Sequence, residues 1–163
     1  MPDTSRARFA IRPATVDEAP ALSDLALRAK AVWGYDAAFL ERCRGPLTVV
    51  AKTIAEGRVL VAGGGDGDRF GFYAFEIDGE DFDLAMLFVD PPAQRRGIGQ
   101  ALMVDALARA RRLDCRRVTI LSDPGAVAFY AAHGAVRAGA APSDAIPGRL
   151  LPLLTIPLRG AAA

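Results

Sequence analysis

Cysteine is scarce in this sequence, and the two cysteines present form no recognisable site. Cys43 and Cys115 stand far apart and belong to no metal-binding or redox motif. A small secreted fold held together by disulfides is therefore excluded, and we expect a reduced, cytoplasmic protein. Histidine is scarcer still, because His133 is the only one, just before Gly134 at the expected end of a helix. A cation interacts well with the helix dipole there, which favours a capping role for His133 over a catalytic one.

Long hydrophobic runs and an excess of charge of either sign are also missing. No apolar run is long enough to span a bilayer, and residues 1–8 lack the apolar core of a signal peptide. The 20 Lys and Arg residues nearly balance the 19 Asp and Glu residues, which leaves a net charge of +1. This balance gives no electrostatic reason to expect a nucleic acid or a membrane surface as a partner. The sequence shows no internal repeat.

The composition is that of an ordinary globular protein. The chain has 163 residues, of which 52% are hydrophobic and 24% are charged. These values are sufficient for a substantial core and argue against disorder. We therefore expect a single domain over residues 1–163, with residues 1–8 as a polar, flexible tail.

Around its middle the chain reads as a strand, a basic glycine loop and a helix. Residues 84–89 form a nearly continuous apolar run, which is typical of a strand covered on both faces. The prolines at 91 and 92 end that strand, because proline cannot donate to a ladder. After residues 94–99 an amphipathic pattern predicts a helix over about 99–112, with its apolar side formed by Ile98, Leu102, Ala106, Ala110 and Leu113.

This loop has the features of an anion site. Gly97 and Gly99 leave the unpaired N–H groups of the helix start accessible, and Arg95 and Arg96 add positive charge. A phosphate or pyrophosphate is the simplest ligand, and an ordinary glycine turn with two solvated arginines is the equal alternative. The Gly-Lys-Ser/Thr ending of a P-loop is absent. A dinucleotide fingerprint is disfavoured, because Leu102 stands where it needs a third glycine.

The remaining elements alternate in a mixed pattern. Strands are expected at 9–12, 59–62, 70–77, 117–121, around 136 and at 150–158, with 139–149 as a connection. Helices are expected from about 15 to 33, 36 to 42 and 125 to 133, the first opened by the capping-box pattern of Thr15–Glu18. The predicted fold class is α/β, a mixed and largely antiparallel central sheet flanked by helices, with one strand–helix–strand crossover.

Two segments resemble motifs of the GNAT N-acetyltransferase superfamily. The loop is similar to the family pattern Gln/Arg-x-x-Gly-x-Gly/Ala through Gln94, Gly97 and Gly99. Residues 121–135 resemble the family motif Asn-x-x-Ala-x-x-Phe-Tyr-x-x-x-Gly-Phe, with matches at Ala126, Phe129, Tyr130 and Gly134. Asp123 stands in place of the asparagine and Ala135 in place of the last phenylalanine.

The resemblance implies a GNAT-like fold and acetyl-CoA as co-substrate. The residues implied in cofactor binding are Phe88, Val89, Gln94, Arg95, Arg96, Gly97, Ile98, Gly99, Gln100, Asp123 and Ala126. The family's asparagine hydrogen-bonds the pantetheine arm, whereas an ionised aspartate can only accept. That contact must therefore be rearranged or lost in this chain.

The resemblance also makes Tyr130 the catalytic residue, as the acid that protonates the departing thiolate of CoA. The alternative for Tyr130 is a helix-face aromatic that packs beside Phe129. No general base is evident, although Glu76, Asp81 and Asp83 flank the strand pair where one often lies. The alternative is that a substrate amine loses its proton through water.

The acceptor site is implied by the family layout alone. It places Trp33 and Tyr35 as an aromatic wall and Arg149 as a clamp for a carboxylate. A helix–helix corner with a loop arginine that pairs with Asp144 is the equal alternative.

We predict an acetyl-CoA-dependent N-acetyltransferase that acts on a primary amine of a small molecule or peptide by direct attack in a ternary complex. A non-catalytic acyl-CoA sensor and a plain nucleotide-binding module are the alternatives. A homodimer is compatible with the sequence.

Overall fold

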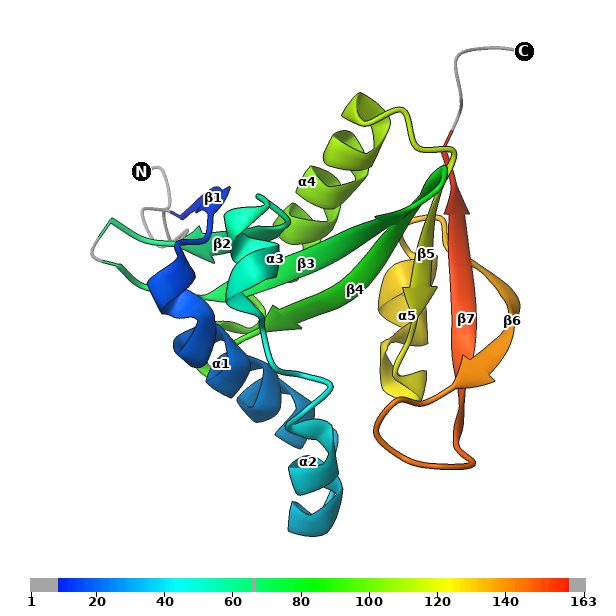
Figure 1. Cartoon of the computed structure of the whole chain (residues 1–163), viewed down its shortest axis with the longest axis horizontal. Coiled ribbons are helices and arrows are strands. Elements are labelled where there is room, and N and C mark those ends of the chain that lie inside the picture. The colour runs from blue at the N-terminus through cyan, green and yellow to red at the C-terminus, as the bar shows by residue number, and fades with distance from the viewer. Residues whose placement is uncertain (1–8, 66, 159–163) are drawn as a thin grey trace, which may run out of the picture.

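The computed structural model describes residues 9–65 and 67–158, and its framework is a seven-stranded sheet (Figure 1). The strand order is β1-β2-β3-β4-β5-β7-β6. Every neighbouring pair is antiparallel except β4 and β5, which are parallel. The strands are β1 (Ala10–Pro13), β2 (Val59–Gly63), β3 (Gly71–Asp78), β4 (Asp81–Val89), β5 (Arg117–Leu121), β6 (Val136–Pro142) and β7 (Leu150–Pro157).

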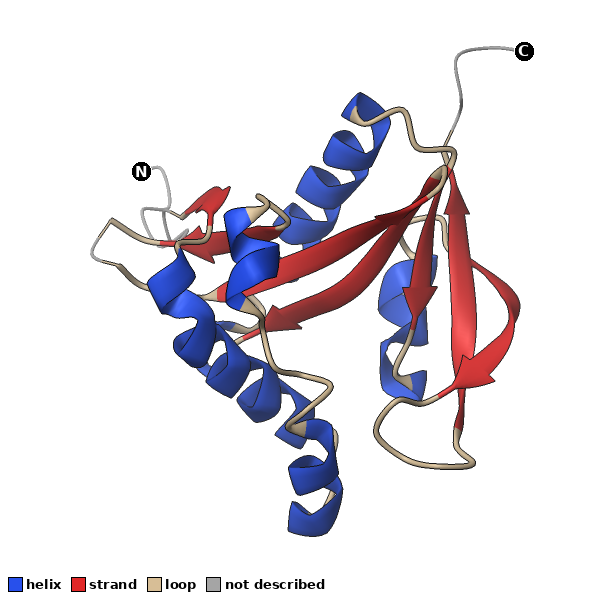
Figure 2. Cartoon of the chain, viewed as in Figure 1, coloured by secondary structure: helices blue, strands red, loops and turns tan. Residues whose placement is uncertain are grey.

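Helices cover both faces of the sheet (Figure 2). They are α1 (Ala19–Ala31), α2 (Ala37–Cys43), α3 (Ala51–Ala55), α4 (Ile98–Arg112) and α5 (Val127–Ala131). Helices α1 and α3 pack on one face of the sheet, and α4 and α5 pack on the other. Helix α4 connects the parallel strands β4 and β5, as expected for a crossover. The mixed, largely antiparallel fold class is thus confirmed.

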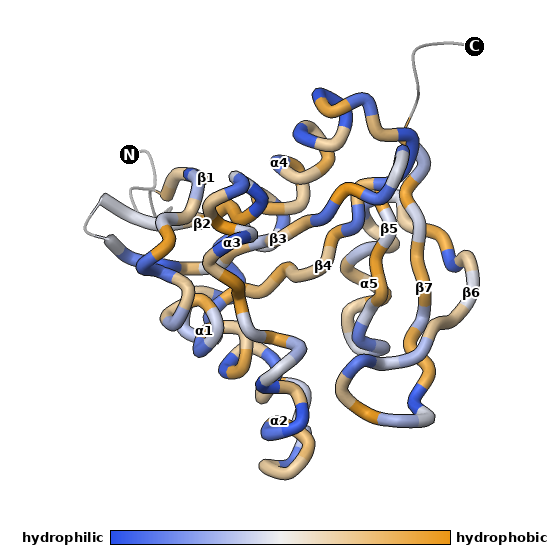
Figure 3. Tube along the Cα trace, viewed as in Figure 1, coloured by the Kyte–Doolittle hydropathy of each residue, from blue (hydrophilic) through white to orange (hydrophobic). Residues whose placement is uncertain are grey.

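Alternate residues of the strands supply the two cores. In β3, Tyr73 and Phe75 pack with α4, whereas Phe72 and Ala74 pack with α1. This is the period of two that places neighbouring side chains on opposite faces. Figure 3 shows the resulting concentration of hydrophobic residues along the strands. None of the helices within residues 9–65 and 67–158 is long and apolar enough to cross a membrane.

Helix α4 follows the predicted amphipathic pattern almost completely. Ile98, Leu102, Ala106 and Ala110 are buried, as the spacing indicates. Leu113 was predicted on the same side but is 50% exposed, because the helix ends at Arg112 and Leu113 lies in the turn that follows. The apolar side of α4 is therefore one turn shorter than the sequence pattern.

Several other assignments differ from the prediction, and helix α5 covers only Val127–Ala131 of the predicted 125–133. Helix α1 ends at Ala31 rather than near Trp33, and the short helix α3 was not predicted. Strand β6 continues to Pro142, so the predicted connection 139–149 is wrong over its first four residues. Gly139 and Pro142 are typical loop residues, but here they pair along β7 with a register shift between Arg137 and Gly139. The predicted tail, residues 1–8, lies outside the described residues.

Strand β4 carries the two irregularities that create the site. Leu84 pairs with Phe75 and Met86 with Ala74, so Ala85 is an extra residue that shifts the register. Toward β5, only Asp81–Asp83 pair with Arg117–Thr119. Beyond that point the two strands diverge, and Figure 1 shows the V-shaped gap between them. The edge of residues 84–89 that faces this gap therefore has no strand partner in the described structure.

Candidate functional site

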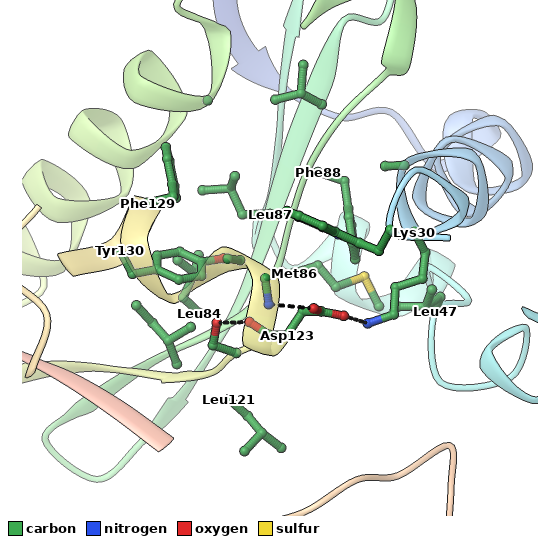
Figure 4. Close-up of a pocket in the computed structure, with 18 of the residues that line it drawn as sticks. Lys30, Leu47, Leu84, Met86, Leu87, Phe88, Leu121, Asp123, Phe129 and Tyr130 are labelled. Carbon is green, nitrogen blue, oxygen red and sulfur yellow. Dashed lines mark hydrogen bonds and ion pairs between the residues drawn. The ribbon is translucent and has the colours of Figure 1, made fainter. Parts of the chain in front are cut away.

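A cavity of about 730 Å³ occupies the gap between β4 and β5 (Figure 4). Its walls come from residues distant in the sequence: the second half of β4, the loop 94–100, the segment 121–126, α5, the end of α1 and the tip of the β6–β7 loop. Volumes of this size suit a small-molecule or cofactor site. No group of His, Cys, Asp or Glu side chains in the described part of the chain is arranged to hold a metal ion.

The start of α4 supplies one wall of the cavity. Gly97 is the residue before the helix and has φ +78°, a left-handed conformation that favours glycine. The first intrahelical hydrogen bond from the N-terminus is Ala101 N to Gly97 O, at 3.0 Å. The N–H groups of Ile98, Gly99 and Gln100 are thus left for a ligand, and all three residues line the cavity. This geometry fits an anion.

Gly99 is a close-packed position in this wall. A Cβ built there meets Phe129 and Val89 at 3.5 Å, which is ordinary contact, so the glycine leaves room without being sterically required.

Leu102, which argued against a dinucleotide fingerprint, is fully buried in the core beneath α4. The structure thus gives Leu102 a packing role.

Most of the predicted cofactor residues lie around this cavity. Its lining includes Phe88, Val89, Gln94, Arg95, Gly97, Ile98, Gly99, Gln100, Asp123 and Ala126. Arg96 is the exception, because its guanidinium lies 5.9 Å from the centre of the Phe70 ring and it does not line the cavity. Arg95 has φ +66°, and its side chain remains at the cavity.

Tyr130 belongs both to the core and to the cavity lining. It is 7% exposed and contacts Phe129 edge-on at 5.2 Å between ring centres. In Figure 4 its ring extends from α5 toward Leu84 of β4. Its hydroxyl makes no hydrogen bond to the described residues. Burial, and then the charge of Asp123, raises the pKa of Tyr130, so the phenol stays protonated at neutral pH.

Asp123 is held by donors from three directions. Its Oδ2 accepts from Lys30 Nζ at 2.8 Å and from the Tyr35 hydroxyl at 2.7 Å, and its Oδ1 accepts from Gly125 N at 2.9 Å. Burial alone would raise the pKa of Asp123, but these hydrogen bonds and the Lys30 charge hold it below the usual value. Asp123 is therefore an ionised carboxylate engaged by protein groups.

The three predicted acceptor residues are only partly at the cavity. Trp33 lines it and packs against Gly125, whereas Tyr35 and Arg149 lie behind that wall. Tyr35 stacks on Phe39 with ring centres 3.9 Å apart, and Arg149 lies over both rings. Arg149 Nη2 also donates to the Tyr35 hydroxyl at 2.8 Å. The alternative pairing of Arg149 with Asp144 does not occur among the described ion pairs.

Of the three carboxylates considered as bases, only Asp83 reaches the cavity. Glu76 pairs with Arg58 and Asp81 with Arg117. Burial raises the pKa of Asp83, a hydrogen bond from Thr119 partly offsets this, and neighbouring carboxylates raise it further. The His133 ring lies beside Phe129, outside the cavity lining, two residues beyond the end of α5, so its capping role stays a prediction.

Sequence reasoning missed Lys30 altogether. This residue lines the cavity, although on α1 it reads as one more polar surface position. Its partner Asp123 lies 93 residues away, so no local pattern could have indicated the ion pair. Cys43 and Leu47, from α2 and the following turn, also line this end of the cavity and carry no motif.

Comparison with known proteins agrees with this fold and site. A family model for an acetyltransferase (GNAT) domain matches residues 23–143, more than half of the chain. The PaiA N-acetyltransferase from Thermoplasma acidophilum, solved with coenzyme A, is similar with a TM-score of 0.73 at 13% identity, over 93% of this chain and 99% of that one. The Escherichia coli ribosomal-protein-S18-alanine N-acetyltransferase is similar with a TM-score of 0.68 at 19% identity, over 95% of this chain and 97% of that one.

At such identities the structural likeness shows the fold, and the family model shows the family. A search of curated proteins found no match. The chain belongs to the GNAT acetyltransferase family, whose enzymes use acetyl-CoA as co-substrate.

Proposed function

We propose that this enzyme moves the acetyl group of acetyl-CoA to a primary amine of a small molecule or peptide, by direct attack in a ternary complex. The observation that carries the proposal is the single cavity that joins the open start of α4, the unpaired edge of β4 and Tyr130. An anion-binding end, a slot for an extended arm and a buried phenol thus lie along one continuous space.

The pyrophosphate of CoA fits the start of α4. The N–H groups of Ile98, Gly99 and Gln100 and the guanidinium of Arg95 provide its positive surroundings. The pantetheine arm would then extend into the gap between β4 and β5, where the free edge of β4 offers backbone groups. Amides near Phe88 and Val89 would hold the acetyl carbonyl and stabilise its developing negative charge.

The chemistry requires one proton to leave the amine and one to reach the sulfur. We assign the first step to Asp83, directly or through a water, because it is the one considered carboxylate at the cavity. The neutral amine attacks the thioester carbonyl, a C–N bond forms, the nitrogen gives the proton it must lose to Asp83, and the C–S bond breaks. Tyr130 then protonates the departing CoA thiolate, a role that its buried, protonated phenol supports.

The acceptor we propose carries a carboxylate beside its amine. Lys30 places an ammonium group at the cavity. Arg149 lies behind it and donates to the Tyr35 hydroxyl, which shares Asp123 with Lys30. The charges of Lys30 and Arg149 are balanced by Asp123 and by Asp144, which also lines the cavity, so the proposal rests on the Arg149 guanidinium, which can bond a carboxylate through two parallel hydrogen bonds. Trp33 adds an apolar surface beside it.

A thiol-release assay with matched amines tests the proposal. Acetyl-CoA would be incubated with alanine and ethylamine, with phenylalanine and phenethylamine, and with a dipeptide, and free CoA would be followed over time. We expect thiol release with at least one amine, faster for the member of each pair that carries a carboxylate. Binding of CoA without release on any amine would contradict the proposed transfer, and equal rates within each pair would contradict the carboxylate.

A further inference from the structure

One carboxylate connects three parts of the chain at the acceptor end of the cavity. Asp123, in the turn between β5 and α5, accepts from Lys30 at the end of α1 and from Tyr35 in the loop between α1 and α2. Tyr35 in turn accepts from Arg149 at the end of the β6–β7 loop. We call Lys30, Tyr35, Asp123 and Arg149 the Asp123 cluster.

The cluster brings the loop after α1 against the turn before α5. Trp33 packs so closely on Gly125 that a Cβ at position 125 would lie 2.7 Å from the Trp33 ring. Gly125 also donates its N–H to Asp123. The packing of the Trp33 ring on Gly125 and the ion pair of Lys30 with Asp123 thus hold the same two segments together, and Figure 4 shows the ion pair.

The negative charge of Asp123 matters to this arrangement. The side chains of Lys30 and Asp123 are only 14% and 11% exposed, so both charges have lost most of their water. Each charge is therefore stabilised mainly by the other. Removing the charge of one would leave the other buried without its partner, which is costly in a poorly solvated site. An asparagine at 123 could still accept from Tyr35 but would not neutralise Lys30.

The same contacts occupy the carboxylate. Oδ2 accepts two hydrogen bonds and Oδ1 accepts one, all from protein groups, and Asp123 has no proton to donate. A side chain engaged in this way is poorly suited to bind a cofactor arm.

We propose that Asp123 is a positioning residue of the acceptor site and not a CoA ligand. It assembles Lys30 and Trp33, with Tyr35 and Arg149 behind them, into the wall that meets the acceptor. That the wall contacts the acceptor rests on the proposed acetyl transfer. Whether Asp123 holds the wall together can be measured without an acceptor.

The test uses Asp123→Asn in the full chain, with two readouts that need no acceptor. Trp33 is the only tryptophan, so its fluorescence reports directly on the contact with Gly125. Calorimetric titration with coenzyme A reports on the cofactor side. Gly125→Ala displaces Trp33 without changing any charge, and Lys52→Gln, at the other lysine, is the exposed control.

We expect Asp123→Asn to shift Trp33 emission to longer wavelength, as Gly125→Ala does, while the Kd for coenzyme A changes less than threefold. Lys52→Gln should change neither. An unchanged Trp33 emission in Asp123→Asn overturns the proposal, because the wall then forms without the carboxylate. A tenfold or greater loss of coenzyme A affinity also overturns it, whatever the emission does, because Asp123 then serves the cofactor.

Steady-state kinetics test whether Asp123 affects binding of the acceptor. With the best amine of the thiol-release panel, we expect Asp123→Asn to raise the acceptor KM at least tenfold and to leave the KM for acetyl-CoA unchanged. Lys30→Gln should have the same effect, and the double variant should be no worse than either single variant, because both remove one interaction. If no amine supports release, the proposed function fails while the fluorescence and calorimetry still decide the role of Asp123.

Discussion

The Thr119 hydroxyl on β5 donates a hydrogen bond to Asp83 Oδ1 on β4 at 3.2 Å, at the last residue pair that joins these strands. Beyond this pair the strands diverge and the cavity begins. The Asp83 carboxylate is thereby held at the closed end of the gap, partly buried, with one hydrogen-bond donor. This position combines access to the cavity with a pKa raised first by burial.

Asp83→Asn tests the proposed base. A base acts only when deprotonated, so kcat/KM should rise with pH through the raised pKa of Asp83. The variant should lose this acidic limb and fall in turnover by on the order of 10²-fold. Glu76→Gln, whose side chain pairs with Arg58 outside the cavity lining, is the matched control: it should keep the limb, moved to lower pH because the Glu76 charge helps to raise the pKa of Asp83. A wild-type profile in Asp83→Asn would leave deprotonation to water.

Tyr130→Phe tests the proposed acid. Loss of the phenol should reduce turnover by on the order of 10²–10⁴ and leave the Kd for acetyl-CoA nearly unchanged. The raised pKa keeps Tyr130 protonated up to alkaline pH, so the effect should be constant from pH 6 to 9. Tyr73→Phe is the control, because Tyr73 is also buried but bonds Asp105 and Arg109 away from the cavity. Wild-type turnover in Tyr130→Phe would make Tyr130 a core residue only.

Gly99→Leu tests the cofactor end of the cavity. A Cβ at Gly99 meets Phe129 and Val89 only at ordinary contact, so the backbone should tolerate the change. The rest of the leucine side chain would press on Phe129 and Val89, which both line the cavity, and should weaken coenzyme A binding at least tenfold, about 1.4 kcal/mol or more. Val104→Leu, on the exposed face of the same helix, should bind coenzyme A normally. Equal calorimetric affinity for the two variants would remove the loop from the site.

Arg149→Lys tests the carboxylate preference. Lysine keeps the charge but cannot lie flat over Tyr35 and Phe39 while bonding the Tyr35 hydroxyl. We expect a higher KM for amines that carry a carboxylate, little change for those that lack one, and unchanged acetyl-CoA binding. If KM rises equally for both kinds of amine, Arg149 only supports the wall and reads no carboxylate.

Glu18→Gln tests a buried ion cluster remote from the cavity. Arg12 bonds both oxygens of Glu18, Arg69 and Thr15 N add further hydrogen bonds, and the pKa of Glu18 falls to about 2. The ionised form therefore stabilises the fold fully above the usual pKa near 4.5, and this contribution is lost as the pH falls toward 2.

Urea unfolding at pH 7 and pH 3 measures this effect. We expect Glu18→Gln to lower the unfolding free energy at pH 7 by on the order of 1–3 kcal/mol, and by less at pH 3. Glu41→Gln, in an exposed pair with Arg44, should change little at either pH. A deficit in Glu18→Gln that is the same at both pH values would show that the ionisation of Glu18 contributes nothing.

Local patterns in the sequence determined the cofactor half of the molecule. The strand, loop and helix over 84–112 are contiguous, and their prolines, glycines and apolar spacing act over a few residues. The capping box that Glu18 completes is equally local. Boundaries failed where a neighbouring strand overrides local preference, as β7 does for Gly139 and Pro142 in β6.

The acceptor half was decided by tertiary structure. Lys30 and Asp123 are 93 residues apart, and Tyr35 and Arg149 are 114 apart, so no periodicity or spacing connects them. Because β4 and β5 diverge after Asp83, a cavity opens between them. The segments that carry these four residues meet at one end of that cavity. Burial then makes each charge depend on its partner, and that dependence exists only once the chain has folded.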